Sequence, residues 1–206
     1  MNDFDGTPHP ARISADALPR CVQEVAGHVD PDGWGQPPRM FALVPTAAIA
    51  VAEPHLIDQL EAGSELTPIE QHPLPDDLHG TGTAIEEYLG TTSWSEGVAG
   101  CLLVQEILVL PPAASEELNS AVSAALAGDN PADDVIRASA GAHPERRAAR
   151  LFAAVLRDGR SECALALAPD EDDDPFAEPE LRTGENLAPG LVHALHATFE
   201  ATDDDW

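Results

Sequence analysis

Five arginines gather in one short stretch of this chain and offer its most conspicuous chemistry. They make up half of the ten basic residues of a 206-residue sequence that contains no lysine and has a formal net charge of -27. The five are Arg146, Arg147, Arg150, Arg157 and Arg160. Because a guanidinium can form two parallel hydrogen bonds with a carboxylate or phosphate, the group is a candidate docking site for an acidic peptide or a small anion. The alternative is that these arginines pair with nearby acids such as Asp158 and Glu162.

Two histidines have the spacing of metal ligands. His193 and His196 lie three residues apart in a predicted helix and therefore near one face of it. A third ligand would have to come from a distant loop that contains His72, His79 and Glu70. The sequence contains no Cys pair and no HExxH motif, so we predict no metal and no cofactor.

A second candidate site lies between two loops, at 33–39 and 65–71. Trp34 and Arg39 belong to the first loop, Glu70 to the second, and Trp94 to a Ser/Thr-rich loop further along the chain. If the four side chains converge on a concave pocket, the chain is a small-molecule-binding protein or an enzyme. No nucleophile elbow surrounds Ser93 or Ser95, and we predict no catalytic residue.

The charge and the cysteines restrict partners and location. A chain of net charge -27 repels nucleic-acid phosphate and anionic membranes, so neither is an expected partner. Cys21, Cys101 and Cys163 lie in apolar segments with no short spacing, which indicates buried thiols in a reducing compartment. The sequence has neither a signal-peptide pattern nor a membrane-length apolar run, and we expect a cytoplasmic protein.

The arginines flank a predicted hairpin at 146–168, which we place at the centre of the fold. Asp158-Gly159 is a pair that closes tight turns between strands. After the turn, apolar residues alternate with period two, which predicts a strand. Before the turn, residues 144–157 fit a strand on the turn signal but also carry a helical apolar stripe, and this alternative stays open.

The other predicted elements complete an α+β fold with an antiparallel sheet. Strands are expected at 39–44 and 98–110, the latter fully buried. A first helix, capped by Ser14, ends before Pro31, and a last helix spans about 189–200. Thr46 is expected to cap a short alanine-rich helix ending near Ala52. We expect the first and last helices to pack on one face of the sheet.

The predicted organisation is a single α+β domain at 14–200. A flexible leader at 1–13 precedes it and an acidic tail at 201–206 follows it. An insertion at 113–143 is rich in Ala, Ser and Asp, and an acidic run at 169–185 reads as a solvated linker.

Several segments together carry a family resemblance. They are LPRCVQEVAGHVDPDGWGQPPRMFALV at 18–44, ELTPIEQ at 65–71, VAGCLLVQEILVLPP at 98–112, VLRDGRSECALAL at 155–167 and APGLVHALHATF at 188–199. In these segments the chain resembles a family of actinobacterial proteins that has a locus-type name and no assigned activity. The resemblance implies a cytosolic actinobacterial protein. We expect a non-catalytic interaction or adaptor protein that binds another protein through its sheet face or its arginines.

Overall fold

The hairpin predicted at the centre of the chain is formed by β4 (Arg147–Leu156) and β5 (Ser161–Leu167) in the computed structural model. Gly159 adopts a φ of 91° in the turn, a conformation that glycine takes without a steric penalty. The Leu156 N–H donates to the Arg160 carbonyl at 2.8 Å and closes the hairpin. The strand interpretation is thus confirmed and the helical one is wrong, because β4 pairs with a strand on each side. The structure describes residues 13–74, 78, 82–109, 146–169, 180–184 and 187–200.

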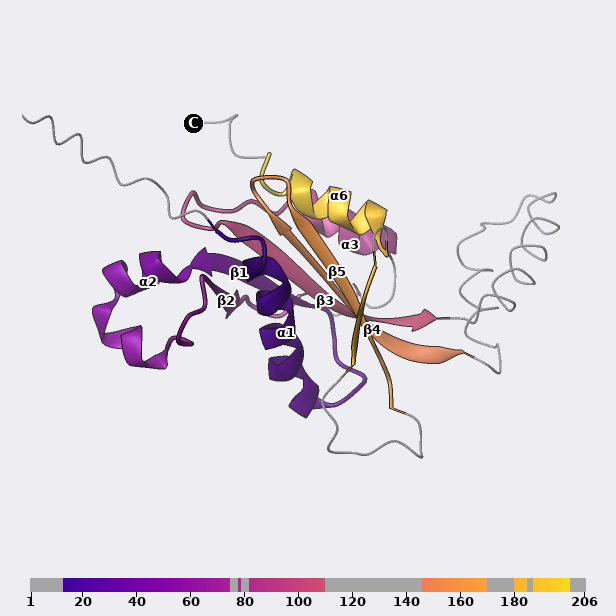
Figure 1. The fold of residues 1–206 in the computed structure, drawn as a ribbon. Helices are drawn as coiled ribbons and strands as arrows, with labels where there is room; N and C mark the ends of the chain where they lie inside the picture. The colour runs from indigo at the N-terminus through magenta and orange to yellow at the C-terminus, as the bar shows by residue number, and fades with distance from the viewer. Residues whose placement is uncertain are drawn as a thin grey trace, which may run out of the picture.

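Six strands form one sheet in the order β2-β1-β3-β4-β5-β6, with every neighbouring pair antiparallel (Figure 1). The remaining strands are β1 (Arg39–Pro45), β2 (Leu66–Glu70), β3 (Gly100–Val109) and β6 (Leu181–Thr183). The antiparallel α+β fold is confirmed. Only the first half of β3 is fully buried, so the expectation of a buried strand along its whole length is wrong.

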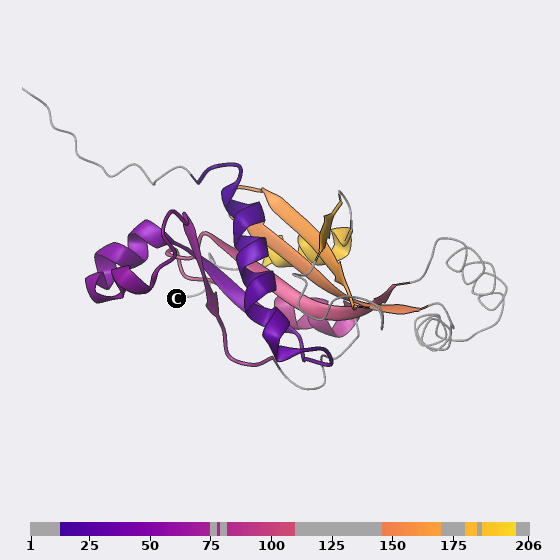
Figure 2. The same ribbon diagram turned by 60° about the horizontal axis from the view of Figure 1, so that its bottom comes forward.

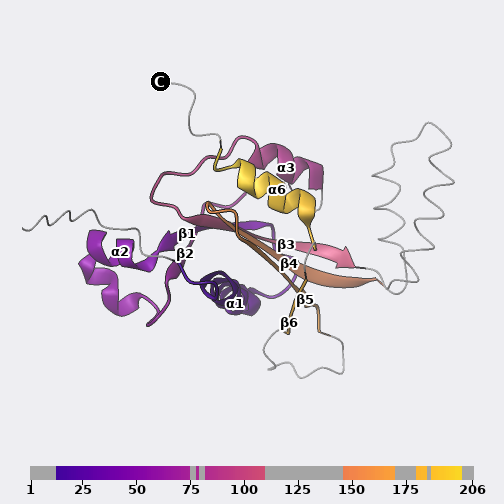
Figure 3. The same ribbon diagram turned by 45° about the horizontal axis from the view of Figure 1, so that its top comes forward.

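Helices cover both faces of this sheet, as the view in Figure 3 shows. Helix α1 (Ala17–Val29) packs on one face, whereas α3 (Gly82–Leu89) and α6 (Pro189–Ala197) pack on the other. The expectation that the first and last helices share a face is therefore wrong. The central strands are apolar on both sides, with Leu102 and Leu103 fully buried against opposite layers, so each face needs a cover.

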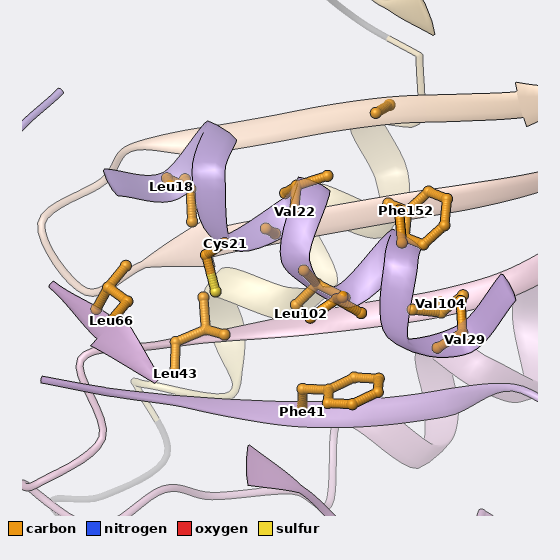
Figure 4. Packing of buried hydrophobic residues seen from close by; sticks show 14 of the residues in the cluster. Leu18, Cys21, Val22, Val29, Phe41, Leu43, Leu66, Leu102, Val104 and Phe152 are labelled. Atoms are coloured by element: carbon orange, nitrogen blue, oxygen red, sulfur yellow. The ribbon is translucent and has the colours of Figure 1, made fainter. Parts of the chain in front are cut away.

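The two layers of core residues follow the alternation of the strands. Beneath α1, the side chains of Val22, Phe41, Leu102 and Phe152 form one cluster, together with the thiol of Cys21 (Figure 4). On the other face, Leu191 and Leu195 of α6 pack with Leu103, Val155 and Cys101. The sheet is thus sealed on both sides.

The structure also corrects several predictions about helix caps and the expected linker. Ser14 does not cap α1: the N-cap is Asp16, without a side-chain bond, and Ser14 instead binds Glu65. Helix α2 (Thr46–Ala52) includes Thr46 as its first residue, after an N-cap at Pro45. The expected linker at 169–185 contains β6, which pairs with β5. The leader through residue 12, the insertion at 113–143 and the tail at 201–206 lie outside the described residues.

No helix in the described part of the chain has the length and apolar character to cross a bilayer.

Candidate functional site

A long excursion separates β1 from β2, although the two strands are direct neighbours in the sheet. Pro45 and Leu66 are paired in the ladder, yet the twenty residues 46–65 lie between them. We call this segment the arm. It contains α2 and the 3-10 helix η2 (Pro54–Gln59), and it projects away from the sheet (Figure 2). Its base is closed by a hydrogen bond of 3.0 Å from the Thr46 N–H to the Glu65 carbonyl.

The sequence of the arm explains its helices but not their exposure to solvent. Alanine-rich residues 46–52 favour a helix, and Pro54 ends it, because the residue before a proline avoids the helical region. Neither α2 nor η2 contains a buried residue. Val51 is 82% exposed and Ile57 is 58% exposed. The arm therefore presents apolar side chains to solvent without contributing to either core layer.

A hollow of about 370 Å³ lies between the arm and the end of β1. Ala50, Ile57 and Leu60 line it from the arm, and Ile13 and Pro45 line it from the body of the protein. Acidic residues border the apolar surface: Glu61 and Glu65 line the hollow, and Glu53 and Asp58 are exposed along the arm. The pKa of Glu65 is lowered because the Ser14 hydroxyl and N–H donate to its carboxylate.

The predicted pocket between the 33–39 and 65–71 loops is filled by an ion-pair network. Arg39 forms two hydrogen bonds with Glu70, at 2.6 and 2.7 Å, and a third with Asp32 at 2.6 Å. This pairing with Arg39 lowers the pKa of Glu70. The space left between Arg39 and Arg150 is only about 10 Å³, too small for a ligand.

The two tryptophans of the same prediction lie apart. Trp34 stacks on Arg150, on the α1 side of the sheet. Trp94 is buried on the α6 side, where its indole N–H donates to the Thr198 hydroxyl at 2.9 Å. The four predicted pocket residues therefore do not line one cavity: the structure joins Arg39 to Glu70 and separates Trp94 from both.

Arg150 is a buried structural residue rather than a surface charge, because only 3% of its area is exposed. Its guanidinium lies 4.6 Å from the centre of the Trp34 ring and donates to the Gly33 carbonyl. It also approaches Glu106 at 3.4 Å, and that carboxylate accepts hydrogen bonds from the N–H groups of Gly35 and Gln36. This arrangement attaches the 33–36 loop to the middle of the sheet.

The other predicted docking arginines lie at the two ends of β4, about 30 Å apart for a strand of this length. At the turn, Arg157 donates to the carbonyls of Val98, Trp94 and Ser95 and stacks on Phe199 at 4.6 Å. Arg160 pairs with Asp158 at 2.7 Å, which lowers the pKa of that carboxyl. At the far end lie Arg146 and Arg147, and Arg147 donates to the Ala168 carbonyl. The five arginines do not form one patch.

An open groove of about 890 Å³ runs between the outer edge of the sheet and α6. His193 and His196 line it from the helix, and Glu162, Cys163 and Thr183 line it from the strands. Among the described residues, no three His, Cys, Asp or Glu side chains come together as metal ligands. The histidine pair thus lines a groove in which the described residues supply no metal site.

Comparison with protein-family models gives a match to the PPA1309-like protein family over residues 18–200. The chain belongs to the PPA1309-like protein family. The family resemblance seen in the sequence is confirmed, and the matched range covers every described strand and helix except Ala17, the first residue of α1. No curated protein and no solved structure matches this PPA1309-like chain.

Sequence reasoning missed both the arm surface and the groove beside α6. For the arm, the sequence predicted the opposite: residues 47–52, AAIAVA, form a helix with no polar residue on any side. Such a helix is expected to be buried. For the groove no local signal existed, because β5, β6 and α6 meet only in the folded chain.

Proposed function

We propose that the protein is a non-catalytic interaction protein that contacts another protein through the arm, residues 46–65. The observation that carries this proposal is an excursion of twenty residues, half of them apolar, with no buried residue in either of its helices, between two strands that are direct neighbours. A connection between such strands commonly needs about two to five residues. Longer ordered excursions are frequently functional.

The hollow under the arm suits an inserted side chain. Interface hot spots are apolar anchors that fill pockets near the centre of a contact. Ala50, Ile57 and Leu60 offer such a pocket, and Val51 extends the apolar surface beside it. This makes the arm a better-supported contact surface than the sheet faces, which are covered by helices.

The acidic surroundings of the arm define the chemistry of the partner. Glu53, Asp58 and Glu61 border the apolar surface, in a chain of net charge -27. A second copy of the chain and an anionic membrane would both be repelled. The partner that fits is an amphipathic protein segment with apolar anchors flanked by lysine or arginine.

The arginines are weaker candidates for the contact surface than the arm, because Arg150 and Arg157 are bound to backbone carbonyls of the protein itself. The alternative of an enzyme or small-molecule binder at the 33–39 and 65–71 loops has less support, because Arg39 is paired with Glu70 and the hollow that Arg39 lines together with Arg150 measures only about 10 Å³. The proposal places the protein in the cytoplasm of an actinobacterium. The three free cysteines and the arginine-only set of basic residues support this location.

Site-specific photo-crosslinking in the source organism tests the proposal. A benzophenone side chain is placed at position 51 or 57 of the full chain, and a matched control carries it at Glu87, which is exposed on α3. We expect both arm positions to capture the same protein through a basic, amphipathic segment, and Glu87 not to capture it. With the crosslinker at position 51, Ile57→Asp should abolish the capture. Identical products at all three positions, or none at the arm, would contradict the proposal.

A further inference from the structure

Strand β5 extends beyond the end of β6 at the outer edge of the sheet. The ladder between them ends where Ala164 faces Thr183, so Ser161, Glu162 and Cys163 lie past it. In the described part of the chain, no strand pairs with these three residues on that side. β6 ends at Thr183 and α6 begins at Pro189, and the groove lies between β5 and this helix.

Some backbone groups of this segment have no hydrogen-bond partner among the described residues, and these groups point into the groove. The Leu156 N–H donates to the Arg160 carbonyl and the Ala168 N–H donates to the Ala148 carbonyl, each at 2.8 Å. Hydrogen-bonded pairs alternate along an antiparallel ladder, so the even-numbered residues of β5 bond to β4. Ser161 and Cys163 therefore direct their N–H and C=O groups away from β4, toward the outer edge.

Side chains alternate on the same segment and create two different surroundings. Glu162 faces Ala154 of the α1-side core, and so lies on that side of the sheet. Ser161 and Cys163 point to the α6 side, where Ala188, Val192 and His193 form the other wall of the groove. A strand placed beside β5 would alternate between these two sides in the same way.

Glu162 is a half-buried carboxylate, and the described part of the chain gives it no cationic partner. Among the described residues, no hydrogen bond or ion pair joins its side chain to another residue. Burial raises its pKa, in contrast to Glu70 and Asp158, whose arginine partners lower theirs. A positive charge directly across from Glu162 would therefore be attracted by a carboxylate that no described side chain neutralises.

We propose that this groove binds a short extended segment of a partner protein, which adds to β5 as a strand and places a lysine or arginine opposite Glu162 between two apolar residues. The main chain of the segment bonds to Ser161 and Cys163, and its apolar side chains contact Ala188 and Val192. The net charge of -27 on the whole chain favours a basic partner segment over an acidic one. This site is separate from the arm and does not depend on the arm's function.

Titration of the ¹⁵N-labelled full chain with a capped Thr-Val-Lys-Val-Thr peptide tests this proposal by NMR. We expect saturable shifts of the Ser161, Cys163 and His193 amides and no shifts in the arm. The same peptide with glutamate in place of lysine should bind more weakly. A peptide with an N-methyl group on its second valine, which cannot donate that hydrogen bond, should also lose affinity.

Reversing the charge of Glu162 distinguishes direct pairing between Glu162 and the lysine of an added strand from a general attraction of the peptide to the acidic protein. Glu162→Gln should lower the affinity for the lysine peptide by up to about fivefold, and Glu162→Arg should reverse the preference between the lysine and glutamate peptides. Glu96→Arg, which makes the same change of charge at an exposed loop position, should keep the original preference. The proposal is overturned if the β5 amides do not shift, if the preference is unchanged in Glu162→Arg, or if N-methylation has no effect. Because the arm amides are followed in the same spectra, binding at the arm alone would be recognised and would count against this site.

Discussion

The β4–β5 turn and the arm both connect neighbouring antiparallel strands, but the first uses residues 157–160 and the second residues 46–65. The turn is rich in charge, and its Arg157 is bound to three backbone carbonyls and an aromatic ring. The arm is rich in apolar residues, and neither of its helices buries any of them. In this protein, conspicuous charge stabilises the fold, whereas uncovered apolar surface marks the better candidate for contact with a partner.

The largest effect is expected from removing the buried charge of β4. Arg150→Met should lower the free energy of unfolding by about 3–5 kcal/mol, because Glu106 then lacks its cation and the Gly33 carbonyl loses its donor. Urea denaturation measures this loss. Arg182→Met, at an exposed pair with Glu180, is the matched control and should stay within about 0.5 kcal/mol. Equal stability of the two variants would show that Arg150 is not part of the scaffold.

Two glycines compare the connections directly, since both have a positive φ, 91° at Gly159 and 87° at Gly63. Gly159→Ala should cost about 1–2 kcal/mol of unfolding free energy, because the strained residue closes the central hairpin. Gly63→Ala should cost less, since the arm can rearrange locally while the sheet stays folded. Equal losses in urea denaturation would mean that the arm is coupled to the core.

The strand after each connection carries one glutamate, and the two are expected to respond oppositely to pH. The pKa of Glu70 lies below its ordinary value of 4.5, so its contribution to stability is present above pH 4.5 and is lost as the pH falls through the lowered pKa. The pKa of Glu162 lies above 4.5, so its ionised form lowers stability at pH 7, and stability rises as the pH falls from the raised pKa toward 4.5.

Urea midpoints of Glu70→Gln and Glu162→Gln at pH 7 and below pH 4 measure this difference, and the two variants change the net charge equally. At pH 7, Glu70→Gln should be less stable than the wild type and Glu162→Gln slightly more stable. Both differences should shrink at the lower pH. Shifts of the same sign at pH 7 would contradict the opposite surroundings of the two carboxyls.

The smallest change in stability is expected from the largest change in sequence. Replacing residues 47–64 by an Asn-Gly turn between Thr46 and Glu65 should alter the free energy of unfolding by less than about 1 kcal/mol, because the helices of the arm bury no side chain and Glu65 keeps its bonds with Thr46 and Ser14. Thermal and urea unfolding would measure it. A truncated chain that fails to fold, while Gly63→Ala folds normally, would show that the arm itself stabilises β1 and β2.

Much of the fold was readable from the sequence because the signals were local. The Asp158-Gly159 turn, the alternation after it and the long apolar run at 98–110 together predicted the central strands. The side on which each helix packs was not readable, because β3 and β4 are apolar on both faces and offer no pattern that assigns α1 or α6 to one of them.

The candidate sites were less readable, because their residues act through tertiary contacts. Arg150 and Arg157 look like surface charges in the sequence, but their partners are carbonyls more than 50 positions away. Val51 and Ile57 look like core residues, and only the fold shows that the arm carries them away from the sheet. The resemblance to the family was correct over most of the chain, yet it identified no catalytic or binding residue.

The placement of two cysteines gives each layer of the protein its own kinetic reporter. Cys21 lies in α1 and Cys101 lies under α6, and burial raises the pKa of each thiol to about 12. Because the thiolate is the reactive form, a disulfide reagent should modify either sulfur only when the helix above it detaches. The two labelling rates therefore report the opening of the two faces separately, and a ligand that binds along α6 should slow the reaction of Cys101 while leaving that of Cys21 unchanged.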